Sequence, residues 1–241
     1  MKKGLRWLVI GGLAAAFACS NGNPVSPSFN DHSPVPWGDE DAELMALCLS
    51  GELTAPEGLY ADISRDLQMI RGEFGAAHPA LNTMKFRPPW VVSSFYIGVD
   101  AVFAAALRNG TFHGWDELNQ RYHLIRIDVG SYLATLYFEG RLHPRRLGEI
   151  YQAATPGIYP QANGLIGDGP NIYPRVSGNV RTYLYRNAWG DCMSGCTDSE
   201  YWYFLCSDSK PPVLMGNWNA RSTGWVWYFD SRLNIEVYRG F

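Results

Sequence analysis

The chain has 241 residues, enough for one sizeable domain or two small ones, because domains usually contain about 100–200 residues. Hydrophobic residues make up 46% and charged residues 18%, so the composition allows a packed core and differs from that of a disordered chain. The formal net charge of −3 excludes the broad basic surface of a nucleic-acid-binding protein, and we expect no nucleic-acid partner. No apolar run after the N-terminus approaches the roughly 20 residues that span a bilayer.

Residues 1–18 have the three zones of a bacterial secretory signal peptide: a basic start, an apolar stretch and small residues before Cys19. Cys19 stands where a lipoprotein carries its lipid, which predicts a membrane partner and, with Ser20 following, the outer membrane of a Gram-negative cell. The small residues Ala16 and Ala18 also fit the ordinary signal peptidase, which would release a periplasmic or secreted product. Loss of the leader's three basic residues leaves 17 basic against 23 acidic residues, a net charge near −6.

Residues 19–38 are rich in Ser, Asn, Pro and Gly and have no hydrophobic period. This composition predicts a flexible tether that spans on the order of 25 Å. After a lipid-bearing cysteine, such a tether would hold a domain away from a membrane surface. A disordered N-terminal tail is the alternative interpretation.

Residues 39–83 are predicted to be a helical segment. An acidic start at residues 39–41 opens one helix, which Gly51 ends. A second helix begins at Pro56 and closes at Gly75. Its apolar residues recur at intervals of three and four, which is typical of a helix with one buried face: Leu59, Ile63, Leu67, Ile70 and Phe74.

Residues 84–168 alternate between strand and helix patterns. The predicted order is strand, helix, strand, strand, helix, strand, over residues 90–98, 99–107, 122–128, 132–140, 143–154 and 158–166. This order predicts a ferredoxin-like βαββαβ module, in which two helices cover one face of a four-stranded antiparallel sheet. The fold class is therefore α+β.

Part of this module, residues 132–166, resembles the inhibitory prosegments of subtilisin-type proteases. The shared features are a strand, a short helix, Pro156-Gly157, and a further strand that contains a small residue and Asn163. The resemblance implies the ferredoxin-like fold and adds protease inhibition as an alternative function.

Residues 169–241 are predicted to be an antiparallel β region. Strands at 180–186 and 201–206 form a hairpin around a cysteine loop, Pro211-Pro212 interrupts the pattern, and shorter strands follow at 213–218, 225–229 and 234–238. The segment WGDCMSGCTDSEYWYF at 189–204 resembles one found in uncharacterised exported bacterial proteins. That resemblance implies no activity.

Four cysteines remain if Cys19 carries a lipid, and an oxidising compartment favours disulfides. Cys192 and Cys196 lie four residues apart beside two glycines, which predicts a small disulfide-closed loop. Cys48 and Cys206 either form a second disulfide or remain buried thiols. A Cys-x3-Cys pair with no adjacent histidine does not have the spacing of a zinc site, so we expect no metal there and no cofactor.

Aromatic residues concentrate in the C-terminal half and supply the candidate ligand contacts Trp189, Trp202, Trp218 and Trp225. Exposed rings of this kind can stack on sugars or hold a peptide. The alternative is that both faces of these strands are packed, because aromatic residues also favour buried strands. Asp168 and Asn171, in a glycine-rich loop, are a weak calcium candidate, and a tight turn explains the same glycines.

The function we predict from the sequence is a non-enzymatic binding module, exported and presented on a tether, with a glycan or peptide ligand. The first alternative is a hydrolase of envelope polysaccharide or peptide that uses carboxylates from the Asp168 and Asp191 loops. The second is the protease inhibitor that the prosegment resemblance implies. The histidines are dispersed, and His143 before Pro144 is interpreted as a helix start.

Overall fold

The computed structural model describes residues 37–165, 167–192, 195–208 and 210–221, all of which belong to one compact unit, residues 33–241. Helices at the start of this part are followed by antiparallel sheets, which confirms the α+β prediction. The predicted signal peptide, the lipidation residue Cys19, Trp225 and the strands predicted at 225–229 and 234–238 lie outside the described residues.

The helices of the N-terminal segment begin and end where the sequence predicts. Helix α1 (Glu40–Ser50) is capped by Asp39, whose carboxylate accepts the Ala42 N–H at 3.2 Å, and ends at Gly51, whose φ of 63° favours glycine. Helix α2 (Glu57–Phe74) follows Pro56. The sequence did not indicate the short helix α3 (Ala80–Thr83).

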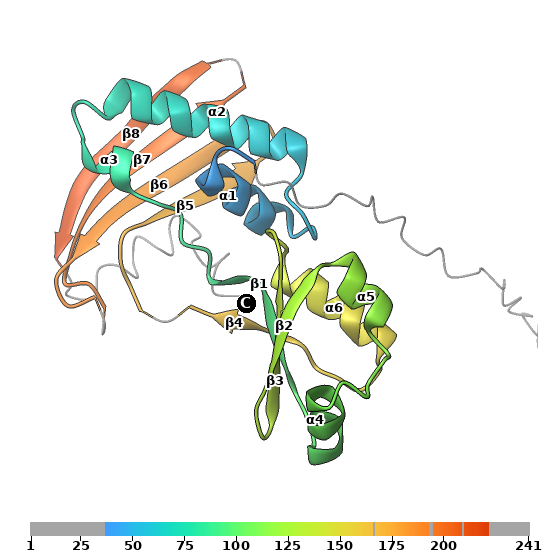
Figure 1. Cartoon of the computed structure of the whole chain (residues 1–241). Coiled ribbons are helices and arrows are strands. Elements are labelled where there is room, and N and C mark those ends of the chain that lie inside the picture. Colours follow the sequence, from blue (N-terminus) through green and yellow to red (C-terminus); the bar gives the residue numbers. More distant parts are fainter. Residues whose placement is uncertain (1–36, 166, 193–194, 209, 222–241) are drawn as a thin grey trace, which may run out of the picture. The chain divides into compact units, whose positions relative to one another are not determined.

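The predicted ferredoxin-like module is present (Figure 1). Its strands have the order β2-β3-β1-β4, and every neighbouring pair is antiparallel. Strand β3 therefore lies between β1 and β2, which is the split βαβ arrangement. The short helix α5 is an addition to the predicted pattern. The elements are β1 (Trp90–Gly98), α4 (Ala101–Arg108), α5 (Asp116–Arg121), β2 (Leu124–Val129), β3 (Leu133–Phe138), α6 (Pro144–Ala154) and β4 (Gln161–Gly164).

One face of this sheet is closed by helices, and its side chains form a core of their own. Phe95 of β1, Leu136 of β3 and Tyr151 of α6 are fully buried there, with Trp115 beside α5. The rings of Phe95 and Tyr151 meet edge to face with centroids 5.3 Å apart, a favourable aromatic geometry. Helix α6 begins at Pro144, directly after His143, where the sequence predicts a helix start. The His143 side chain caps the helix and accepts the Arg146 N–H at 3.5 Å.

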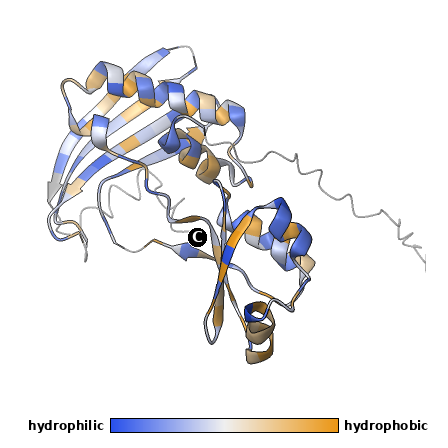
Figure 2. Ribbon diagram, viewed as in Figure 1, coloured by the Kyte–Doolittle hydropathy of each residue, from blue (hydrophilic) through white to orange (hydrophobic). Residues whose placement is uncertain are grey.

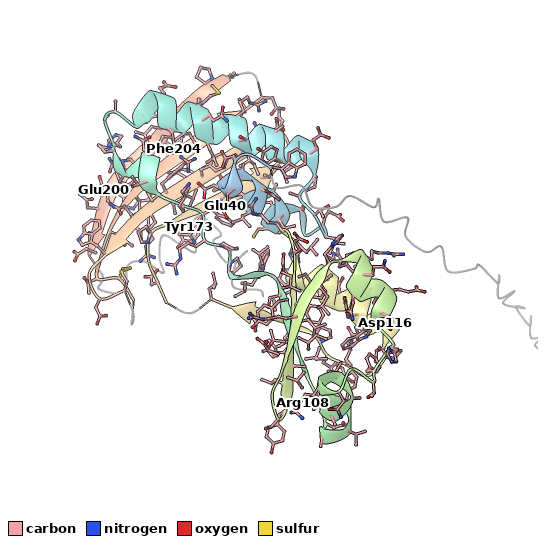
Figure 3. All side chains as sticks on the ribbon, viewed as in Figure 1. Glu40, Arg108, Asp116, Tyr173, Glu200 and Phe204 are labelled. Atoms are coloured by element: carbon pink, nitrogen blue, oxygen red, sulfur yellow. A yellow bond between two sulfur atoms is a disulfide. The ribbon has the colours of Figure 1, made fainter. Side chains whose placement is uncertain are left out.

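The C-terminal sheet is an antiparallel meander with the order β5-β6-β7-β8. Helices α1 and α2 lie on one of its faces (Figure 1). Phe204 of β7, labelled in Figure 3, contacts Phe74 of α2 with ring centroids 5.1 Å apart. Hydrophobic and hydrophilic residues follow one another along α2, as Figure 2 shows, and its predicted stripe is the buried part. The strands are β5 (Asn171–Ser177), β6 (Val180–Trp189), β7 (Asp198–Ser207) and β8 (Lys210–Arg221).

The two edge strands of this sheet differ from the sequence prediction because both contain proline. Strand β5 holds Pro174 and was not predicted. Strand β8 runs through Pro211-Pro212, where the sequence predicts a break, so that prediction is wrong. Proline cannot donate to a sheet ladder, but an edge strand has one side on which no donor is needed. A proline within a β pattern here marks an edge strand.

The helices before the ferredoxin-like module and the sheet after it share a single core, so the module is an insertion. Ile63 and Leu67 of α2 pack in one cluster with Tyr183 and Tyr185 of β6. The helical segment 39–83, predicted as a separate region, is therefore the second layer of the C-terminal sheet. A helix with one apolar face needs a partner, and this sheet supplies it.

The segment that leads into the inserted module and the segment that leads out of it are hydrogen-bonded to each other. The Arg87 N–H donates to the Asn171 side-chain oxygen at 2.8 Å, and the Asn171 amide donates back to the Arg87 carbonyl at 3.2 Å. The Leu165 N–H also donates to the Pro89 carbonyl at 3.2 Å. Adjacent entry and exit points are what allow a domain to be inserted without disturbing its host.

A buried ion pair connects α2 to the C-terminal sheet. The Asp66 carboxylate accepts hydrogen bonds from the Arg181 Nε at 2.5 Å and from the Tyr183 hydroxyl at 2.9 Å. The side chains of Asp66 and Arg181 are both only 3% exposed. Arg181 also donates to Asp208 at 2.7 Å. Burial of a charge is tolerated only with such partners, so the pair determines how α2 sits on β6.

Candidate ligand-binding face

The face of the ferredoxin-like sheet opposite its helices carries polar and aromatic side chains, and we call it the open face. Strand alternation places Phe95 and Ile97 on the helix side and Tyr96 between them on the other side. In β3, Leu136 faces the helices and Tyr137 the open side. The local sequence therefore determines which rings are buried and which are presented.

A bulge in β1 precedes the open face. The pairing of β1 with β4 changes register between Trp90 and Phe95, and Ser93 has a φ of 55°. Its hydroxyl accepts the Leu142 N–H at 2.7 Å and donates to the Gly140 carbonyl at 2.8 Å. A non-glycine residue in this region is held by its surroundings, and these bonds supply the restraint.

Tyr96 and Tyr137 are half-buried and lie on neighbouring strands. Tyr96 is paired across the strands with Thr135, and Tyr137 with Ser94, so the two rings are diagonal neighbours. The Tyr96 hydroxyl donates to the Gln161 side-chain oxygen at 2.6 Å. The rings are thus set in one layer on a rigid sheet.

Charged and amide side chains border the two rings. The Arg126 guanidinium lies 4.1 Å from the centre of the Tyr137 ring, and its Nη2 is 3.3 Å from an Asp128 oxygen. More than half of each of these two charged side chains is exposed. At the other edge, the Asn163 amide donates to the Ser94 hydroxyl at 2.8 Å. Flat rings beside exposed donors and acceptors suit a ligand with apolar faces and hydroxyl edges.

The tryptophans predicted to contact a ligand differ in their exposure to solvent. Trp202 is 1% exposed and belongs to the core beneath α2, which argues against ligand contact by this residue. Trp218 is half-buried and stacks on Tyr201 with ring centroids 5.5 Å apart. Trp189 is 47% exposed at the end of β6 and remains a candidate. Trp225 lies outside the described residues.

Asp168 and Asn171, the weak calcium candidate, are occupied by protein contacts. The Asp168 carboxylate accepts from Arg186 at 2.5 and 2.8 Å and from the Cys196 N–H at 3.0 Å. Asn171 is bonded to the Arg87 backbone. Within the described ranges no group of three or more His, Cys, Asp or Glu residues is placed to hold a metal ion. Gly167 has a φ of 96°, a conformation that favours glycine beside Asp168.

The charge state of Asp168 follows from these contacts. Burial by itself raises the pKa of this carboxyl group, but the hydrogen bonds from Arg186, Cys196 and Gly169 and the charge of Arg186 lower it to about 2. A hydrolase acid must carry a proton near neutral pH, and Asp168 does not. Asp191, its predicted partner in the hydrolase alternative, is exposed.

The four cysteines after Cys19 comprise one disulfide pair and two free thiols, which is one of the two arrangements predicted from the sequence. Cys192 and Cys196 form the predicted disulfide. Cys48 and Cys206 are free thiols, and both lie against the core of α1, α2 and the C-terminal sheet. Burial raises the pKa of Cys206 to about 12 and that of Cys48 well above its ordinary value. Because only a thiolate is reactive, these two are structural residues.

We expect Cys48 and Cys206 to resist alkylation in the native protein. Iodoacetamide at pH 8 should leave both unmodified, because the raised pKa values of these thiols leave almost no thiolate to react. The same reagent in concentrated urea should modify both. Peptide mass spectrometry separates the two cases, and rapid alkylation of Cys206 without denaturant would contradict its burial.

Tyr96 and Tyr137 were not among the residues predicted from the sequence, where the tryptophans of the C-terminal half are the most prominent aromatic feature. A signal was present: in WVVSSFYIG and YLATLYFEG, Tyr96 and Tyr137 alternate with the apolar residues that face the helices. The contribution of Arg126 and Gln161 depends on the pairing of strands far apart in the chain. The sequence pattern holds no comparable signal for them.

No protein-family model, curated protein or solved structure matches this chain. Across the described residues, no helix has both the length and the apolar character needed to cross a membrane. The functional assignment therefore depends on the residues and their geometry alone.

Proposed function

We propose that this protein is an exported, lipid-anchored bacterial envelope protein that binds a polysaccharide on the open face of its ferredoxin-like sheet, without chemically altering it. Export and anchoring are supported by the signal-peptide pattern of residues 1–18, by Cys19 and by the tether that follows. The binding role is supported by one observation above all. Tyr96 and Tyr137 lie in one layer among exposed hydrogen-bonding side chains.

A sugar ring presents C–H groups on its faces and hydroxyl groups at its edges. Tyrosine rings can contact the faces, and the side chains of Arg126, Asp128 and Gln161 can bond the hydroxyl groups. The ligand we favour is an uncharged or weakly charged glycan, because the predicted mature chain is acidic. The open face is less suited to an extended peptide. Such a peptide binds to the free backbone groups at the edge of a sheet, whereas the open face offers side chains.

Replacing Tyr96 or Tyr137 with alanine should weaken glycan binding about tenfold each. A ring contact contributes roughly 0.5–1.5 kcal/mol beyond the area that it buries, and tenfold corresponds to about 1.4 kcal/mol. Affinity electrophoresis of the mature protein through gels that contain soluble envelope polysaccharides would measure this. Tyr132→Ala is the matched control, because Tyr132 is 82% exposed in the turn before β3, outside the strands that carry Tyr96 and Tyr137.

The outcomes separate the candidate functions. Saturable retardation that both tyrosine variants lose and Tyr132→Ala keeps supports the proposal. Equal retardation of all four proteins, or none with any polysaccharide, would reject it. Release of soluble sugar during the same experiment would indicate the hydrolase, and slower cleavage of a test substrate by subtilisin would indicate the inhibitor.

A further inference from the structure

Strand β2 lies at an edge of the ferredoxin-like sheet. Among the described strands it pairs with β3 alone, so the backbone groups along its other side have no partner strand there. Such an edge can pair with a strand of another chain unless proline, a bulge or a cover prevents it. The sequence of β2, LIRIDV, contains no proline.

The second half of β2 is both regular and accessible. The register of its ladder with β3 shifts between Leu124 and Arg126, and residues 126–129 then pair one to one with β3. The side chains of Arg126 and Asp128 are 59% and 56% exposed, and Ile125 is 65% exposed. This edge therefore has the geometry and the exposure that another strand needs.

We propose that a second copy of this chain pairs with the β2 edge through its own β2, antiparallel and centred on Ile127. A two-fold axis makes such an interface self-complementary, so each contact occurs twice. With Ile127 opposite Ile127 of the partner subunit, Arg126 lies opposite Asp128 of the partner subunit, and Asp128 opposite the partner's Arg126. The apolar residue Ile125 lies opposite the partner's Val129.

The register follows from the charges. Directly opposite residues of an antiparallel pair lie on the same face of a sheet, so both Arg–Asp contacts form on the open face. Arg126 and Asp128 are 3.3 Å apart within one chain and more than half exposed, which leaves each of them accessible to the partner's opposite charge. A pairing centred on Arg126 or on Asp128 would instead place two like charges opposite each other, which is unfavourable.

Helix α4, which packs against β2, leaves room for the second copy. Its exposed residues are Ala101, Val102, Ala105 and Arg108, most of which have small side chains. The pairing joins two four-stranded sheets into one, with both open faces on the same side, because opposite residues share a face. A long ligand could then contact both copies at once. The dimer itself is inferred from strand register and charge and does not depend on the proposed glycan site.

Reversal of one charge at a time tests the proposal. We expect residues 20–241, made without a lipid and containing the described compact unit, to sediment as a dimer at high micromolar concentration. Arg126→Asp and Asp128→Arg should each weaken the dimer about tenfold or more, because each change places like charges opposite each other twice. A mixture of the two variants should recover the dimer, since one chain then carries two aspartates and the other two arginines.

The double variant Arg126→Asp/Asp128→Arg restores both charge pairs and should dimerise like the parent. It also shows whether the exchanged residues are compatible with folding, which far-UV circular dichroism confirms for each variant. A parent that sediments as a monomer at every concentration would overturn the proposal. So would single variants that dimerise as tightly as the parent, or a mixture that stays monomeric. No polysaccharide is present in these measurements, so their failure is distinct from a failure of glycan binding.

Discussion

Replacement of Asp66 by alanine should lower the free energy of unfolding by about 3–5 kcal/mol, the range found when one partner of a buried ion pair is removed. The Arg181 guanidinium, 3% exposed, would lose its bonds at 2.5 and 3.3 Å and would be left buried beneath α2. The Tyr183 hydroxyl would lose its acceptor as well. Asp208 would remain as an ion-pair partner of Arg181, but its side chain is 53% exposed to solvent. Urea unfolding followed by far-UV circular dichroism measures the change.

Two further variants make this result specific. Asp62 is also close to Arg181, at 3.5 Å, but its side chain is 38% exposed, so Asp62→Ala should cost less than about 1 kcal/mol. Replacing both partners, Asp66→Leu with Arg181→Met, should recover most of the stability, because no buried charge is left unpaired. If Asp66→Ala and Asp62→Ala had equal small effects, the pair would contribute no more than a surface ion pair.

The second large effect concerns pH and Asp168. Its pKa is lowered to about 2, so the folded protein binds a proton at this group less readily than the unfolded chain does. The resulting stabilisation is fully present above the ordinary aspartate pKa, near 3.9, and is lost as the pH falls through about 2. A difference of this size corresponds to about 2 kcal/mol. Asp168→Asn should therefore destabilise the protein near pH 6 and have little further effect near pH 2.

The measurement is a series of urea unfolding curves from pH 6 to pH 2 for the parent and for Asp168→Asn. Asp191→Asn is the matched control, because this exposed aspartate lies beside the same disulfide loop and should change stability by less than about 0.5 kcal/mol at any pH. A difference between parent and Asp168→Asn that does not shrink on acidification would exclude the Arg186 ion pair as its cause.

Asp168 also shows how the inserted module is joined to its host. Its carboxylate bonds Arg186 of β6 and the Cys196 N–H of the disulfide loop, and its carbonyl accepts from Arg87 at 3.1 Å. One residue thus connects the entry of the insertion, the C-terminal sheet and the disulfide loop. In the sequence, Asp168 stands out for its glycine-rich surroundings, but it contacts Arg186 and Arg87, which lie 18 and 81 positions away.

The sequence by itself determined the elements whose signals are local. The spacing of apolar residues in α2, the alternation in β1 and β3, the acidic helix start at residues 39–41, the stop at Gly51 and the short Cys192–Cys196 separation all involve neighbours along the chain. The ferredoxin-like order followed, because the order of helices and strands leaves few ways to close one sheet.

Only the tertiary structure decided which elements share a core and which rings are exposed. Helix α2 packs against strands that lie more than 100 residues later in the chain, and Trp202 is buried in the core beneath it. Tyr96 lies half-buried on the open face. The physical reason is that an apolar face specifies only that it must be buried. Which surface buries it depends on packing and charge pairing between distant segments, such as Asp66 with Arg181, and no local pattern encodes that pairing.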